Sequence, residues 1–173
     1  MDYYRGPGIL SRAARRGGTA SVELALVMPV LIVLLFGSIE VGMLVKASIT
    51  VSRISNEAAR MAGIGAAPAR IDAHTASSAT GLDPDLLSAV YERRSWDVDT
   101  QAWGEWTTLG TDPLNPADND ASMGEQVRVV LDYPYALLFR GLFGAAMRAD
   151  GDGALHLPAT VVTARGFGEY REQ

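Results

Sequence analysis

The chain has 173 residues, a formal net charge of −5 at pH 7 and no cysteine. This length allows one domain of ordinary size beside a membrane anchor. The lack of cysteine excludes a disulfide framework and a thiolate metal site. We expect no nucleic-acid partner, because no basic patch beyond residue 18 could neutralise a phosphate backbone.

Residues 1–18 form a short leader that contains glycine and arginine and has no apolar period. We expect it to be disordered or to lie at a membrane interface. Four arginines in it, Arg5, Arg12, Arg15 and Arg16, are opposed only by Asp2. Because dense basic clusters stay in the cytoplasm, the N-terminus should lie inside and the bulk of the chain should be exported.

Residues 24–45 are apolar, and Glu40 is their only charge. As a helix these 22 residues would be about 33 Å long, enough to cross a hydrocarbon core of roughly 30 Å. Apolar side chains cover every side of this helix, whereas a buried helix of a soluble protein usually has a polar stripe. A cleavable secretory signal has a shorter apolar region, and a twin-arginine signal needs apolar residues directly after its arginines. We therefore predict a membrane span.

Gly18, Thr19 and Glu23 stand at the start of this span. Cleavage after Gly18 would make Thr19 the first residue and Glu23 the fifth, an arrangement that resembles type IV prepilins. The stretch GTASVELALVMPVLIVLLFGSIEVG, residues 18–42, resembles more closely the TadE-like pseudopilins of tight-adherence (Flp) pilus systems. Their span typically reads Val-Glu-Phe-Ala-Leu, then Pro, aliphatic residues and Phe-Gly-Ile-Ile-Glu. Here Leu24 replaces the usual Phe, which leaves the cleavage pattern intact.

The resemblance implies a non-enzymatic pseudopilin or minor pilin without a cofactor, in a bacterial inner membrane or incorporated in a pilus. The implied partners are a prepilin peptidase, other pseudopilins or pilins, the pilus assembly platform and membrane lipid. An alternative is an unprocessed bitopic protein whose exported domain binds an envelope ligand. A third alternative is an anchored enzyme.

Glu23 is a carboxylate close to the membrane core, where an uncompensated charge costs several kcal/mol. The N-terminus of the helix favours an anion by roughly 0.3 to 1 kcal/mol. The ammonium of a newly formed Thr19 terminus, on the same chain or a neighbour, would be a stronger partner. We expect Glu23 to act in assembly; the alternative is an anchor in the headgroup layer.

Four further residues of the span have predicted roles. Pro29 should kink the helix or melt one turn near residues 25–29. Gly37 and Gly42 offer close packing to another helix. Glu40 lies about 25 Å beyond Glu23 along a helix, near the outer interface, and should either be solvated or contact a partner helix.

Residues 46–65 continue the helix in amphipathic form, with Ile54, Ala58, Met61 and Ile64 on one face. We therefore expect one N-terminal helix over residues 19–66 and an exported α+β domain over residues 67–173. The segment Glu57-Ala-Ala-Arg60 also matches the TadE-like pattern.

The exported domain should hold a small antiparallel sheet of about four strands. We expect a short helix over residues 69–80, a hairpin from residues 86–98 and 103–109, and a loop over residues 111–124. The strands over residues 126–135 and 154–166 resemble the C-terminal part of TadE-like proteins, and Pro134 should end its strand or stand at a sheet edge. Residues 136–147 fit a short helix on the sheet or a lip that touches the membrane surface or a neighbouring subunit.

Catalytic and metal-binding motifs are absent from the sequence. His74 and His156 stand alone, and we interpret the strings at residues 118–122 and 150–153 as turns without metal, because neither has the spacing of a calcium loop. Trp96, Trp103 and Trp106 belong either to the sheet core or to an exposed patch for a partner or for adhesion.

Overall fold

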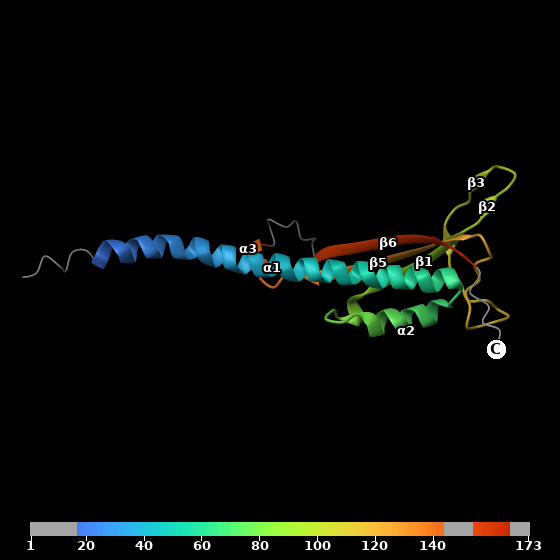
Figure 1. The fold of residues 1–173 in the computed structure, drawn as a ribbon, viewed down its shortest axis with the longest axis horizontal. Helices are drawn as coiled ribbons and strands as arrows, with labels where there is room; N and C mark the ends of the chain where they lie inside the picture. The colour runs from blue at the N-terminus through green and yellow to red at the C-terminus, as the bar shows by residue number, and fades with distance from the viewer. Residues whose placement is uncertain (1–16, 144–153, 167–173) are drawn as a thin grey trace, which may run out of the picture. The chain divides into compact units, whose positions relative to one another are not determined.

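The computed structural model describes residues 17–143 and 154–166 (Figure 1). The fold is α+β, as predicted: a long N-terminal helix accompanies a four-stranded antiparallel sheet. The chain divides between Ile39 and Glu40 into two compact units. The predicted leader and the string at residues 150–153 lie outside the described residues.

Helix α1, Gly17–Ile64, contains 48 residues and includes both the predicted span and the amphipathic segment after it. The helix continues through Pro29, so the predicted melted turn is wrong; a kink at Pro29 stays a prediction. The physical reason lies in the apolar surroundings. Each additional unpaired backbone group would be costly there, so a helix that loses only the hydrogen bond of proline itself is favoured.

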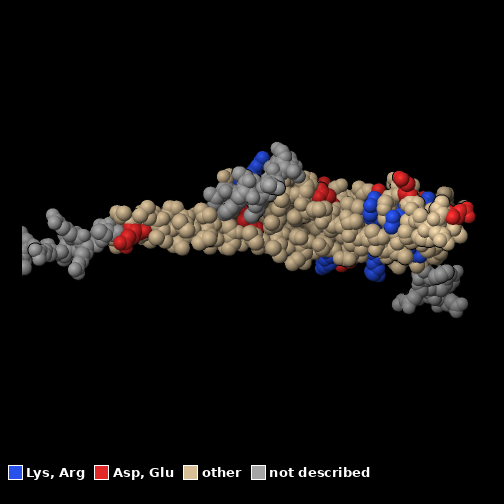
Figure 2. All heavy atoms as spheres, turned by 90° about the horizontal axis from the view of Figure 1, so that it is seen from above, with Lys and Arg blue, Asp and Glu red and all other residues tan. Residues whose placement is uncertain are grey.

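The first unit contains most of the apolar stretch of α1, residues 24–39. Its side chains are exposed on all sides, as Leu26 shows with 72% exposure. The helix is long and apolar enough to cross a membrane, by length and composition. Residues 24–39 carry no charge, and Figure 2 shows the corresponding uncharged surface along this part of α1. Such a surface needs an apolar solvent, which supports single-pass anchoring.

The C-terminal end of α1 is closed by a Schellman motif. The N–H of Gly65 donates to Ala62 O and that of Ala66 to Met61 O, both at 3.0 Å. Gly65 has φ of 103°, a left-handed conformation that glycine adopts without strain. The buried side chain of Asn119 donates to the carbonyl oxygens of Ala62 and Ala66, at 2.9 and 3.0 Å. A loop distant in sequence thus adds a second donor to Ala62 O of α1 and a donor to Ala66 O just beyond its end.

Helix α2, Pro68–Ser78, confirms the predicted short helix and begins with proline at its first turn, where no backbone donor is needed. The hydroxyl of Tyr91 donates to Asp72 at 2.7 Å and so connects α2 to the sheet. Burial raises the pKa of Tyr91, and the hydrogen bond to the Asp72 carboxylate raises it further. His74 lies 3.2 Å from Glu57 and connects α2 to α1.

The four-stranded sheet has the order β4-β1-β5-β6, and all its pairs are antiparallel. Its strands are β1, Ser88–Arg94; β4, Thr107–Thr108; β5, Gln126–Ala136; and β6, Ala154–Ala164. The short strands β2, Trp96–Asp97, and β3, Ala102–Trp103, pair as a second sheet that extends the β1–β4 hairpin. The predicted hairpin and both predicted long strands are thus confirmed.

Both prolines of the sheet lie where their strand pairs with only one neighbouring strand. The pairing of β1 with β5 ends at Asp132, so Pro134 pairs only with β6, which confirms its edge position. The strand continues past Pro134 to Ala136. Pro158 lies in β6, which is an edge strand. A missing N–H is tolerated at such places because no neighbouring strand requires it.

The core lies between the second part of α1 and one face of the sheet, with α2 beside α1 (Figure 1). Alternate residues of β5 are buried, as the pattern predicted. On α1 a row of buried apolar side chains follows helical spacing: Ala47, Val51, Ile54, Ala58 and Ala62. Ile64 is 53% exposed, so its predicted place on the buried face is wrong. It follows Ala62 by two residues, about 200° around the helix.

Candidate functional site

The start of α1 carries the predicted processing and assembly residues. Because α1 begins at Gly17, Glu23 lies in the second turn of the helix. Glu23 is exposed. Thr19 precedes it by four residues, so both residues belong to the same helix face.

The peptide bond between Gly18 and Thr19 lies in the first turn of α1. The first four N–H groups of a helix have no acceptor within it, and glycine has a low helix propensity. Unwinding this turn would therefore cost little free energy. Its position favours access by a peptidase, which must reach the backbone of the bond that it cleaves.

Glu40 is the one carboxylate within the predicted span, and it is fully buried. Its two oxygens accept hydrogen bonds from the backbone N–H groups of Leu138, at 3.1 Å, and Phe139, at 3.0 Å. A charged acceptor with two backbone donors makes strong hydrogen bonds. The expectation of a solvated carboxylate is therefore wrong. In this structure Glu40 binds a loop of its own chain, and a contact with a partner helix stays a prediction.

Tyr135 is buried next to Glu40. Burial raises the pKa of the Tyr135 phenol, and the negative charge of Glu40 raises it further. A neutral phenol beside the carboxylate avoids a second buried negative charge. The end of β5, the loop after it and α1 therefore form one connected arrangement around Glu40.

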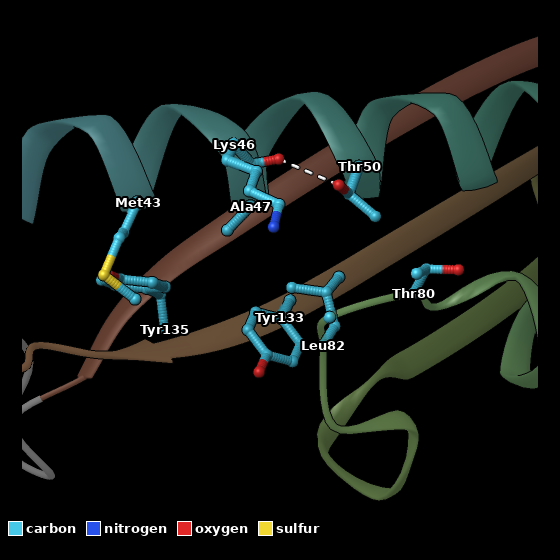
Figure 3. Close-up of a pocket in the computed structure, with 9 residues that line it drawn as sticks. Met43, Lys46, Ala47, Thr50, Thr80, Leu82, Tyr133 and Tyr135 are labelled. Atoms are coloured by element: carbon cyan, nitrogen blue, oxygen red, sulfur yellow. Dashed lines mark hydrogen bonds between the residues drawn. The ribbon is translucent and has the colours of Figure 1, made fainter.

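A small pocket of about 130 Å³ lies next to this arrangement, between α1, β5 and the segment after α2 (Figure 3). Figure 3 shows Lys46 and Thr50 on α1 above Tyr133 and Leu82, with the Thr50 hydroxyl donating to Lys46 O at 2.9 Å. Drug-sized ligands occupy pockets of roughly 300 to 1,000 Å³. The lining contains no carboxylate and no histidine to form an acid–base pair.

The aromatic cluster, Trp96, Trp103 and Trp106, lies outside the buried core, so the interpretation as sheet core is wrong. Trp96 is 47% exposed, and its ring meets that of Trp103 edge to face at 5.3 Å. Arg94 lies over the rings of Trp103 and Trp106, at 5.2 and 4.4 Å from their centroids. Arg128 lies 4.3 Å from the Trp106 centroid.

The arginines of this cluster are themselves held in place. Arg94 donates twice to the side chain of Gln126, at 2.8 and 2.7 Å, and Arg128 forms an ion pair with Glu92. Cation–π contacts of this kind contribute about 0.5 to 2 kcal/mol each. The cluster is therefore an ordered, half-exposed surface, and its contact with a partner stays a prediction.

The predicted turn at residues 118–122 has structural roles. Asp118 accepts from Asn115, and Asp120 accepts from the N–H of Gly110 at 2.7 Å. The two histidines do not stand alone as expected: His74 pairs with Glu57, and His156 lies 2.5 Å from Asp132. Among residues 17–143 and 154–166, no group of three or more His, Asp or Glu side chains is arranged to hold a metal.

The two glycines predicted to pack against another helix differ in exposure. Gly37 is half-buried, and Gly42 is exposed. A Cβ added at Gly42 would meet no atom within 4 Å, so this position has room for a neighbouring helix. Whether another helix packs there stays a prediction.

Local sequence gave no sign of the backbone donors from Leu138 and Phe139, nor of the cap from Asn119. Each contact joins residues more than 50 positions apart. Alternate residues of a strand share a face. A surface of arginine and tryptophan could therefore have been predicted from the alternation of Glu92, Arg94 and Trp96, together with that of Arg128 and its neighbours.

Comparisons of the chain with curated proteins and with solved structures found no match. Comparison with protein families did: residues 18–60 match the family described as TadE-like protein. This range begins at the predicted cleavage residue and ends at Arg60, within the part of α1 that packs on the sheet. The match confirms the resemblance predicted from the sequence: residues 18–60 of this chain are similar to the TadE-like family.

Proposed function

We propose that this chain is a pseudopilin, or minor pilin, of a Tad (Flp) pilus or a related secretion machine. A prepilin peptidase cleaves it after Gly18, and the mature chain begins at Thr19. Residues 24–45 then hold it in a bacterial inner membrane, with its N-terminus in the cytoplasm and most of its second unit outside. Its partners are other pseudopilins and the assembly platform, and its role is structural.

The observation that carries this proposal is the order of groups at the start of α1. A Gly-Gly pair of low helix propensity in the first turn and an exposed carboxylate four residues after Thr19 precede an apolar stretch of α1 that is exposed on all sides. The family match over residues 18–60 supports it independently. A processed Thr19 ammonium and a neighbour's Glu23 carboxylate attract one another strongly where water is scarce.

Glu23→Gln tests the assembly role. The substitution keeps size and hydrogen bonding but removes the charge, so the helix should insert at least as well as before. Incorporation into the pilus machinery, measured by crosslinking to other pseudopilins, should fall about tenfold or more, because a charge-assisted contact is lost. Glu105→Gln, at an exposed carboxylate of the second unit, is the matched control and should assemble normally. Normal assembly of Glu23→Gln would leave Glu23 as an interfacial anchor.

A second candidate function follows from the aromatic cluster. Its rings are half-exposed and ordered by Arg94 and Arg128, as in surfaces that bind a ligand or partner. An unprocessed bitopic protein that binds an envelope ligand through this cluster would retain its leader. Processing after Gly18 therefore separates the two functions.

A further inference from the structure

The predicted span and the second unit overlap. The span covers residues 24–45, whereas the second unit begins at Glu40. Lys46, the only lysine of the chain, follows the span directly and fits its outer end, where a long basic side chain reaches water. Glu40 therefore lies about 8 Å inside that end along the helix axis.

A carboxylate at this depth requires protein partners, because lipid tails offer none. Leu138 and Phe139 supply them through their backbone N–H groups, and Glu40 is left with no exposed surface. Hydrogen bonds of 3.0–3.1 Å hold the donors at the depth of their acceptor. The loop that carries these donors must therefore reach the outer leaflet as well.

We name residues 137–141 the lip. Its first residue, Leu137, is buried in the core, and the next, Leu138, is 60% exposed. Arg140 and Gly141 are exposed. An outward leucine followed two residues later by an outward arginine is a pattern suited to the boundary between acyl chains and headgroups.

We propose that the lip is a lipid-binding surface, with Leu138 in the outer leaflet and Arg140 among the phosphate headgroups. The occupant is lipid because the lip is held on the last turns of the membrane span itself. This inference rests on the anchoring that is part of the proposed function, and it is independent of leader cleavage and pilus assembly. It gives the second unit two points of contact with the membrane surface and so limits its rotation about α1.

Depth-dependent fluorescence quenching tests this proposal. The chain has no cysteine, so a single introduced cysteine can carry an environment-sensitive nitrobenzoxadiazole label. The full chain is labelled at Leu138→Cys and reconstituted in phosphatidylcholine–phosphatidylglycerol vesicles, with and without brominated lipid. Leu31→Cys reports the middle of the span, and Leu114→Cys, at a side chain that is 95% exposed, reports water.

Quenching by brominated lipid at Leu138 should approach that at Leu31 and exceed that at Leu114 several-fold, with a matching blue shift of emission. Arg140→Cys is a second probe of the lip and should give intermediate quenching, so the test does not depend on one variant. Quenching at Leu31 but at neither lip position would overturn the proposed contact of the lip with lipid. It would leave the membrane anchor and the pseudopilin proposal intact. A blue shift without quenching would also overturn it and would indicate that a second copy covers the lip. An unquenched Leu31 would refute the span, and the lip with it.

Discussion

Glu40 interrupts an otherwise uncharged helix segment, and its environment explains how the chain tolerates it. Both carboxylate oxygens have a backbone donor, and the adjacent Tyr135 is a neutral phenol whose pKa burial raises further. A buried carboxylate without these donors would be strongly destabilising. Glu40 thus holds the loop after β5 against α1 of the same chain. The sequence of the span alone could not predict this contact.

Glu40→Ala should free the lip from α1. The substitution leaves two backbone N–H groups without their acceptor. This loss should lower the free energy of unfolding of the second unit by about 2–4 kcal/mol. Amide hydrogen exchange at Leu138 and Phe139 in detergent-solubilised full chain should accelerate. Ser38→Ala is the control, because the Ser38 hydroxyl donates only to its own helix, at Leu35 O. Equal protection of both amides in Glu40→Ala and the parent would contradict the assigned role.

At the scale of elements, the sequence predicted most of what local periodicity determines. Helical spacing indicated α1 and the buried positions of Ile54 and Ala58, and alternation indicated β5 and β6. Its errors concern interactions distant in sequence. The burial of Glu40 depends on a loop 98 residues away, and the order of the tryptophan cluster depends on Arg94 and Arg128, which lie over its rings.

The candidate site divides in the same way. Gly18, Thr19 and Glu23 were predictable because their pattern is local and is read along one helix. The lip was predicted only as one of several interpretations of an apolar segment, since its contact with Glu40 arises from folding. The closure of α1 by Asn119 was not predicted, because its contacts join residues more than 50 positions apart and a local turn pattern does not reveal them.

Gly65→Ala tests the closure of α1. Alanine at φ of 103° is strained by about 1–2 kcal/mol. Its Cβ would also lie 1.9 Å from the Arg165 guanidinium, which would have to move and give up its hydrogen bond to Ala121 O. Gly124→Ala is the matched control, with φ of 87° and no atom within 4 Å of the added Cβ.

The second unit contains every tryptophan of the chain, so intrinsic fluorescence during urea unfolding of the full chain reports on this unit. The free energy of unfolding should fall by about 1 kcal/mol more in Gly65→Ala than in Gly124→Ala, which is the contribution expected of one hydrogen bond. Equal losses in the two variants would show that Arg165 adds nothing to the closure.

At the scale of the whole molecule, the chain combines an apolar helix that needs lipid with an α+β unit built on the continuation of the same helix. This continuity lets one element anchor the protein and form the spine of its folded part. A filament subunit requires such coupling, because the contacts that hold helices together must also position the exposed unit. The Arg–Trp surface of the hairpin then remains available to a partner.

The most direct measurement for the pseudopilin proposal is the mass of the mature chain. The full sequence is produced in cells with an active prepilin peptidase and in cells with an inactive one, extracted from membranes and analysed by intact mass spectrometry. Gly18→Leu should block cleavage, while Gly17→Ala, its neighbour in the same turn, should not. We predict a chain that begins at Thr19 only where the peptidase is active. A chain that keeps Met1 or Asp2 at its N-terminus in the presence of active peptidase would contradict the proposal.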